Sequence, residues 1–284
     1  MGIYEKLIPN SLKGLLFFSF FGFFLSACEQ PTEGCLDFRA LQVNIGADEA
    51  CSDCCAYPAV QLQFIPARID AGVVQSLRTT DTLTHGARSG TQTELAYYLH
   101  DIFLITEQGE RFEMQDTFTV FSNGQTPNYR YESSVLRVTP FSQTNYELGI
   151  LLEEKTFVAV EAKVGLPDIF TDVDHTLQPV GSPLFQNTDS LLLSVIDSSY
   201  FDIGFTYSTL TGNRDSVQLA DASNQLVTWT FQEPFNYQPS FNLLVSVALP
   251  VDMLLAFNNA TISGELFVND FLKEASVISV SASR

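Results

Sequence analysis

The segment FVAVEAKV, Phe157–Val164, decides the fold. Apolar side chains at positions 158, 160, 162 and 164 alternate with Glu161 and Lys163, as in a β-strand with one buried face. Other short runs rich in Val, Ile, Phe, Tyr and Thr occupy positions 60–64, 99–104, 118–120, 135–138, 191–195, 201–207, 226–231, 241–249, 262–268 and 277–280. Strands that do not alternate with helices predict an all-β fold, an antiparallel Greek-key β-sandwich.

The segments between these runs predict turns and two long loops. Gly, Asn, Asp and Pro at positions 107–110, 122–124, 211–215 and 233–234 are typical of turns. Residues 68–90 are polar and predict a loop, and residues 164–187 predict a packed loop because they combine prolines with apolar side chains. Val251–Phe257 is the best candidate for a short helix.

The N-terminus carries the pattern of a lipoprotein signal peptide. Lys6 and Lys13 precede an apolar run, Leu15–Leu25, which ends in Leu-Ser-Ala before Cys28. That run is shorter than the roughly 20 residues a membrane-spanning helix needs. We therefore expect residues 1–27 to be removed and Cys28 to be lipidated, which places the protein on a membrane in the cell envelope, at the outer membrane or cell surface. The alternative is an ordinary signal peptide followed by a chance cysteine.

Residues 28–57 form a cysteine-rich segment ahead of the main domain, residues 58–284. Cys35, Cys51, Cys54 and Cys55 are an even set in an exported chain, which predicts two disulfides stapling the segment. Three connectivities are possible, and adjacent cysteines rarely pair, so Cys54 and Cys55 should each reach back to Cys35 or Cys51. The alternative is a zinc site made of the same four thiols.

The cysteine-rich segment also contains acidic side chains. Asp37, Asp48, Glu49 and Asp53 are oxygen ligands of the kind calcium takes, but their spacing does not match an EF-hand. Turn capping is the favoured explanation. In its Gly-Cys-x-Asp start and its acidic pair before Cys51, the segment resembles an element near the N-termini of surface proteins of the Bacteroidetes type.

Charge and motifs exclude several functions. The chain has 33 Asp and Glu against 14 Lys and Arg, a net charge of −19. A nucleic-acid partner is excluded, since such binding needs a basic surface. The sequence contains no nucleophile elbow, no zinc-protease helix motif and no phosphate-binding glycine loop, so we expect no enzyme activity.

Three segments resemble the MbnP-like, methanobactin-associated copper-binding domain family. They are ELAYYLHDIFLI at Glu94–Ile105, VAVEAKVGLP at Val158–Pro167, and the loop at positions 174–184. The resemblance implies an extracytoplasmic β-sandwich, copper bound in some members, and association with a di-haem peroxidase-like protein. Members with the copper site carry a Trp-rich stretch where this chain has residues 184–187. The only tryptophan is Trp229, ordinarily a core residue and, if the resemblance extends so far, a candidate oxidised residue.

Copper ligation depends on three histidines. His85, His100 and His175 are the only imidazoles, and copper sites usually use two or three. His85 and His175 could meet at one end of the sandwich, and Asp101 could orient the ring of His100. Alternatively, the three are unrelated. On the residues alone, three unrelated histidines are the favoured interpretation, whereas the resemblance implies a lipoprotein that binds or handles copper. The alternatives are a metal-free surface lipoprotein that engages a protein or glycan, and a substrate of a peroxidase-like enzyme modified at Trp229.

Overall fold

The structure, a computed structural model, describes residues 31–283, except 52, 71–72, 79, 115–117, 122–127, 143–144, 171–172, 187–189, 195–198, 210, 223 and 258–261. The expected signal peptide and Cys28 lie outside these residues. The chain divides into two compact units, a small one with residues up to 38 and 42–55, and a large one with residues 39–41 and 56–284.

The small unit is held together by two disulfides. Its strands β1 (Glu33–Gly34) and β2 (Glu49–Ala50) form a short parallel pair. Cys35 is bonded to Cys55 with Cα atoms 4.9 Å apart, and Cys51 to Cys54 with Cα atoms 5.7 Å apart. The prediction of two disulfides, with neither Cys54 nor Cys55 bonded to the other, is confirmed. The Asp48 carboxylate accepts hydrogen bonds from the backbone N–H of Thr32, at 3.0 Å, and from its hydroxyl, which is a capping role.

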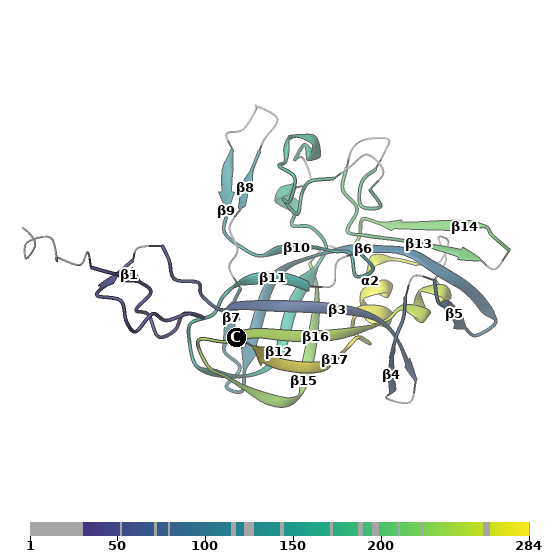
Figure 1. Cartoon of the computed structure of the whole chain (residues 1–284). Coiled ribbons are helices and arrows are strands. Elements are labelled where there is room, and N and C mark those ends of the chain that lie inside the picture. The colour runs from purple at the N-terminus through teal and green to yellow at the C-terminus, as the bar shows by residue number, and fades with distance from the viewer. Residues whose placement is uncertain are drawn as a thin grey trace, which may run out of the picture. The chain divides into compact units, whose positions relative to one another are not determined.

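The large unit consists mainly of two sheets (Figure 1). The eight-stranded sheet has the order β14-β13-β6-β12-β15, and three more strands, β5, β7 and β10, pair with β6. Their bounds are β5 (Thr82–His85), β6 (Arg88–Thr106), β7 (Arg111–Glu113), β10 (Val135–Val138), β12 (Lys155–Val164), β13 (Ile203–Thr209), β14 (Arg214–Leu219) and β15 (Gln225–Tyr237).

The second sheet has five strands in the order β11-β3-β16-β17, with β4 paired to β3. These are β3 (Ala59–Asp70), β4 (Val73–Ser76), β11 (Asn145–Ile150), β16 (Asn242–Pro250) and β17 (Ser276–Ser283), while β8 (Phe118–Val120) and β9 (Tyr129–Tyr131) form a separate hairpin. The predicted all-β sandwich is confirmed. Within the described part of the large unit, one strand pair is not antiparallel, because β3 and β16 run parallel.

Apolar side chains from both sheets form the main core. Along β3, buried and half-buried positions alternate, which directs Leu62 and Phe64 inward. Phe64 packs edge-on against the rings of Tyr97, Tyr146 and Trp229, at centroid distances of 6.0, 5.9 and 5.5 Å. Strand alternation thus places the aromatic residues from distant segments in one cluster.

Four sequence-based assignments need correction. Residues 262–268 are not a strand but lead into α2 (Gly264–Phe267) and the π-helical turn η4 (Val268–Leu272). Residues 68–90 are not one loop but include β4 and β5. Glu233-Pro234 is not a turn between strands. Both residues lie within β15, where its pairing with β12 shifts register. In 191–195, the described residues form only a bridge between Leu193 and Tyr200.

The helix prediction and the prediction of a packed loop after β12 hold, whereas the turn predicted at 122–124 lies outside the described residues. The predicted helix at 251–257 is the 3₁₀ helix η3 (Val251–Ala256). After β12, residues 165–202 contain two short 3₁₀ helices among the described residues, η1 (Asp168–Phe170) and η2 (His175–Leu177). We call this stretch the covering segment. Among the described residues, no helix is long and apolar enough to cross a membrane.

Candidate functional site

The covering segment packs on the face of β6 that points away from the main core. Tyr97 and Leu99 belong to the main core, while Ala96 and Tyr98 face the other way and join a second apolar cluster. In that cluster they meet side chains of the covering segment and of strands β8 and β10, namely Leu166, Phe170, Leu184, Leu192, Val120 and Val135. The covering segment is therefore part of the packed structure, as its apolar content predicted.

A polar layer lies beside this cluster. The Arg137 guanidinium donates to the backbone carbonyl of Phe185 at 2.7 Å and to the side chain of Gln186 at 3.2 Å. The Gln186 amide in turn donates to the Tyr98 hydroxyl. Burial raises the pKa of Tyr98 far above its ordinary value, so this hydroxyl stays protonated. The layer fixes the covering segment to β6 and β10.

A buried carboxylate anchors both ends of the covering segment. Asp202 is 4% exposed, and its two oxygens accept the backbone N–H groups of Leu166, at 2.9 Å, and of Ala222, at 3.0 Å. No sequence pattern indicates this role, because the three residues are far apart in the sequence and the donors are backbone groups.

His100 lies on the same outer face of β6 and is buried, with 2% of its surface exposed. Its Nδ1 is 3.5 Å from the Oδ1 of Asp101, yet neither ring nitrogen makes a hydrogen bond. Burial lowers the pKa of His100, although the adjacent Asp101 carboxylate works in the opposite direction. His100 is therefore a neutral, buried imidazole whose Nδ1 lies near the Asp101 carboxylate and whose Nε2 has no hydrogen-bond partner within the described part of the chain.

A bulge brings Asp101 to this position. Asp101 has a φ of 48°, in the left-handed region, and the pairing of β6 with β12 shifts register here. Its carboxylate is bound by the Lys163 ammonium at 2.8 Å and by the Ser133 hydroxyl at 3.2 Å. Partial burial works to raise the pKa of Asp101, but the hydrogen bond from Lys163, the charge of Lys163 and the interaction with His100 together outweigh it, so the pKa lies below its usual value. In a regular strand, His100 and Asp101 would point to opposite faces of the sheet. The bulge instead brings the Asp101 carboxylate beside the His100 ring.

His175 is buried at the start of η2 in the covering segment, with 5% of its surface exposed. Asp174 caps this short helix by accepting the Thr176 N–H at 2.8 Å. The Nδ1 of His175 is 3.0 Å from the backbone carbonyl oxygen of Gln186. Because a carbonyl only accepts, Nδ1 carries the proton, which leaves the Nε2 lone pair as a ligand atom.

The other residues named from the sequence lie elsewhere. His85 is half-buried at the end of β5, opposite Arg88. Trp229 is 1% exposed in the main core, and its Nε1 donates to the carbonyl of Leu272 at 3.0 Å, so the ordinary interpretation of this residue is confirmed. Among the described residues, the groups of three or more His, Cys, Asp or Glu side chains close enough to share an ion comprise only Cys51, Cys54 and Cys55. The three histidines do not form such a group.

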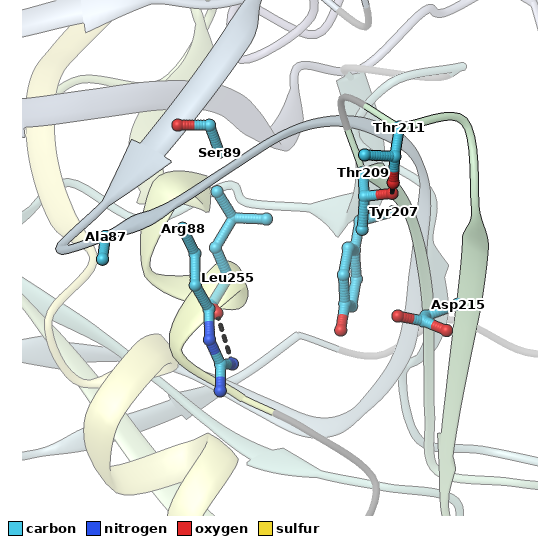
Figure 2. A pocket seen from close by; sticks show the side chains of 8 residues that line it. All are labelled: Ala87, Arg88, Ser89, Tyr207, Thr209, Thr211, Asp215 and Leu255. Atoms are coloured by element: carbon cyan, nitrogen blue, oxygen red, sulfur yellow. Dashed lines mark hydrogen bonds between the residues drawn. The ribbon is translucent and has the colours of Figure 1, made fainter.

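A surface pocket of about 570 Å³ opens at a different place, between two hairpins and η3 (Figure 2). It is lined by residues 87–89 at the turn between β5 and β6, by Tyr207, Thr209, Thr211 and Asp215 of the β13–β14 hairpin, and by Leu255. We call it the hairpin pocket. No local sequence pattern points to it, because its walls come from segments that are far apart in the chain, two of which meet through the pairing of β6 with β5 and β13.

The hairpin pocket has a cation on one side and an anion on the other. The Nη1 of Arg88 donates to the carbonyls of Leu255, Ala256 and Phe257, at 2.8, 3.2 and 3.3 Å, which holds the guanidinium over the end of η3. Tyr207 and Asp215 are cross-strand partners, which places the Tyr207 hydroxyl near the Asp215 carboxylate (Figure 2). Burial, followed by the nearby negative charge of Asp215, raises the pKa of Tyr207. The hydroxyls of Thr209 and Thr211 lie 2.8 Å apart.

Comparisons with known proteins add little. A scan against models of protein families gave no match, and a search of curated protein sequences gave none either. A search of solved structures matched MbnP from Methylosinus trichosporium with 11% sequence identity and a TM-score of 0.38, over 67% of this chain and 76% of that chain. Similarity at this level indicates only a distant structural relationship and assigns no role to any residue.

Proposed function

We propose that the protein is an exported lipoprotein, anchored by lipid at Cys28, whose β-sandwich binds copper through the buried imidazole of His100. His175 is the proposed second ligand. The protein is not proposed to be an enzyme. The observation that carries the copper proposal is that both ring nitrogens of His100 are buried and without hydrogen bonds.

The buried ring nitrogens of His100 need a hydrogen-bond partner or a metal ion. Buried polar atoms are nearly always hydrogen-bonded, and leaving one unsatisfied costs about 1–3 kcal/mol. A metal on Nε2 would satisfy one nitrogen, and the Asp101 carboxylate, 3.5 Å from Nδ1, would orient the ring from the other side. Neutral imidazole is the form that ligates copper, and burial keeps His100 in that form. Copper, when bound, would supply a redox-active centre at the covering segment.

The residues differ in how well they fit this site. His175 has a ligand atom to offer, because its bond to the Gln186 carbonyl leaves Nε2 available. His85 contributes no comparable feature, and Trp229 is occupied by core packing and by the Leu272 carbonyl. The proposed site therefore uses two of the three imidazoles and does not use the tryptophan. Association with a di-haem peroxidase-like protein stays a prediction from the family resemblance alone.

The test is metal analysis of the chain, purified without a histidine tag, for the wild type and three alanine variants. The wild type should retain a single copper ion, and His100→Ala should weaken copper binding by more than about 100-fold, since loss of a ligand exceeds loss of its supporting contacts. His175→Ala should weaken binding as well. His85→Ala is the matched control and should bind like the wild type. A wild-type protein without copper affinity, or an equal loss in the His85 variant, would contradict the proposal.

The pH dependence follows from the lowered pKa of His100. Its neutral form persists below the ordinary histidine value of about 6.5, so copper affinity should hold through that pH and fall only below it. In the metal-free protein, the unfolded chain takes up a proton on this residue at a higher pH than the folded chain does. The free energy of unfolding should therefore decrease as the pH falls through about 6.5, and His100→Gln should remove this part of the dependence.

The anchor is tested separately. Replacing Cys28 with serine should block lipid attachment, so the protein should remain unprocessed or appear in the soluble fraction. The measurement is fractionation of the producing cells followed by mass spectrometry of the N-terminal peptide. Membrane retention with normal processing in Cys28→Ser would show that another element holds the protein at the membrane.

A further inference from the structure

The hairpin pocket has the features of a ligand site that is separate from the histidines. Its volume, about 570 Å³, lies in the range of small-molecule sites. Its polar side chains come from β6 and the β13–β14 hairpin, and η3 adds the apolar side chain of Leu255. Several of the polar groups are held in place by contacts within the protein. Positioned polar groups around an open volume are what a specific site requires.

The charges of the hairpin pocket favour a neutral ligand. Arg88 on one side and Asp215 on the other bring opposite charges, and the chain as a whole has a net charge of −19. An anion would be repelled by Asp215 and by the overall field. A cation would meet the fixed guanidinium of Arg88. A neutral ligand that both donates and accepts hydrogen bonds can use both sides.

The remaining lining groups specify the ligand further. Ser89, Thr209 and Thr211 provide hydroxyls, while Tyr207 and Leu255 provide apolar surface between the two charged groups. A sugar ring matches this mixture, because its hydroxyls lie around the edge and its C–H groups form an apolar face. A carboxylate accepts hydrogen bonds from sugar hydroxyls, and a guanidinium donates hydrogen bonds to the hydroxyl oxygens. An aromatic ring packs on the C–H face of the sugar.

We propose that the hairpin pocket binds a neutral pyranose, with Asp215 accepting its hydroxyls, Arg88 donating to them and Tyr207 packing against the ring. The pyranose is either a free oligosaccharide or the exposed end of a polysaccharide. This proposal does not rest on copper binding, because it shares no residue with the histidine site.

The experiment is titration calorimetry of the intact chain with maltotriose, cellotriose, xylotriose and chitotriose as probes. At least one should bind, and Asp215→Asn and Tyr207→Ala should each weaken that binding about tenfold or more, the size of a lost hydrogen bond to a charged group or a lost ring contact. Tyr207→Phe keeps the ring and should stay within about threefold of the wild type. Asp270→Asn removes one exposed carboxylate on η4 and is the matched charge control. Thermal unfolding of each variant checks that it folds.

A second arm distinguishes the two sources of the sugar. If the affinity for insoluble cellulose or chitin exceeds the affinity for the matching trisaccharide, the natural ligand is a polysaccharide. If the affinity for the free trisaccharide is higher, the natural ligand is an oligosaccharide. Failure of all four trisaccharides to bind would overturn the proposal. So would binding that Asp215→Asn and Tyr207→Ala leave unchanged, or binding of inorganic phosphate in place of sugar. None of these outcomes depends on whether copper binds.

Discussion

Replacing Trp229 with alanine should lower the free energy of unfolding by about 3–5 kcal/mol, the cost of truncating a large buried aromatic side chain. Its ring lies 5.5 Å from that of Phe64, centroid to centroid, in the aromatic cluster of the main core. Truncation leaves a cavity there and also leaves the Leu272 carbonyl without its donor. Urea unfolding followed by circular dichroism measures the change.

Two variants sharpen this prediction. Trp229→Phe keeps an aromatic ring but loses the indole N–H, so it should cost less than the alanine variant. Val180→Ala changes an exposed side chain, 84% accessible, and should shift stability by no more than about 0.5 kcal/mol. A loss below about 1 kcal/mol in Trp229→Ala would show that this residue does not anchor the core, and would reopen a functional role for it.

The Asp202→Ala variant should lose about 3 kcal/mol of stability, since it leaves two buried backbone N–H groups without an acceptor. One of them belongs to Leu166 at the start of the covering segment and the other to Ala222. Asp202→Asn retains one carbonyl oxygen and should lose roughly half as much. Hydrogen exchange at the two amides, followed by mass spectrometry, localises the effect.

Asp270→Asn serves as the control for this change of charge, since Asp270 is exposed and should shift stability by less than about 0.5 kcal/mol. If Asp202→Ala unfolds at the same denaturant concentration as the wild type, the carboxylate does not hold the covering segment. Protection of the Leu166 amide that survives the substitution would contradict the assignment in the same way.

Strand periodicity predicted most of the sandwich, and the failures have local causes. Residues 262–268 contain enough apolar side chains to suggest a strand, but the buried positions, 264, 267, 268, 271 and 272, follow a helical spacing. Ser263 also caps that helix by accepting the N–H of Leu266 at 3.2 Å. Both signals were present in the sequence and would have corrected the prediction.

Other features had no local signal. The parallel pairing of β3 with β16 joins segments from opposite ends of the large unit, and side-chain alternation carries no information about strand direction. The histidines were identified from their residue type, but the burial of His100 and its position beside Asp101 depend on the tertiary structure, including the bulge at Asp101. The hairpin pocket depends on three elements whose proximity is set entirely by strand pairing.

The parallel pairing of β3 with β16 has a consequence for how the chain is made. Synthesis proceeds from the N-terminus, so β3 emerges long before β16. Its edge on that side, with unpaired N–H and C=O groups, stays open for as long as elongation takes. An open apolar strand edge is where a nascent chain pairs with the wrong neighbour. The five-stranded sheet can therefore close only after β16 has been made. Until then, the open edge of β3 must be shielded from other strands.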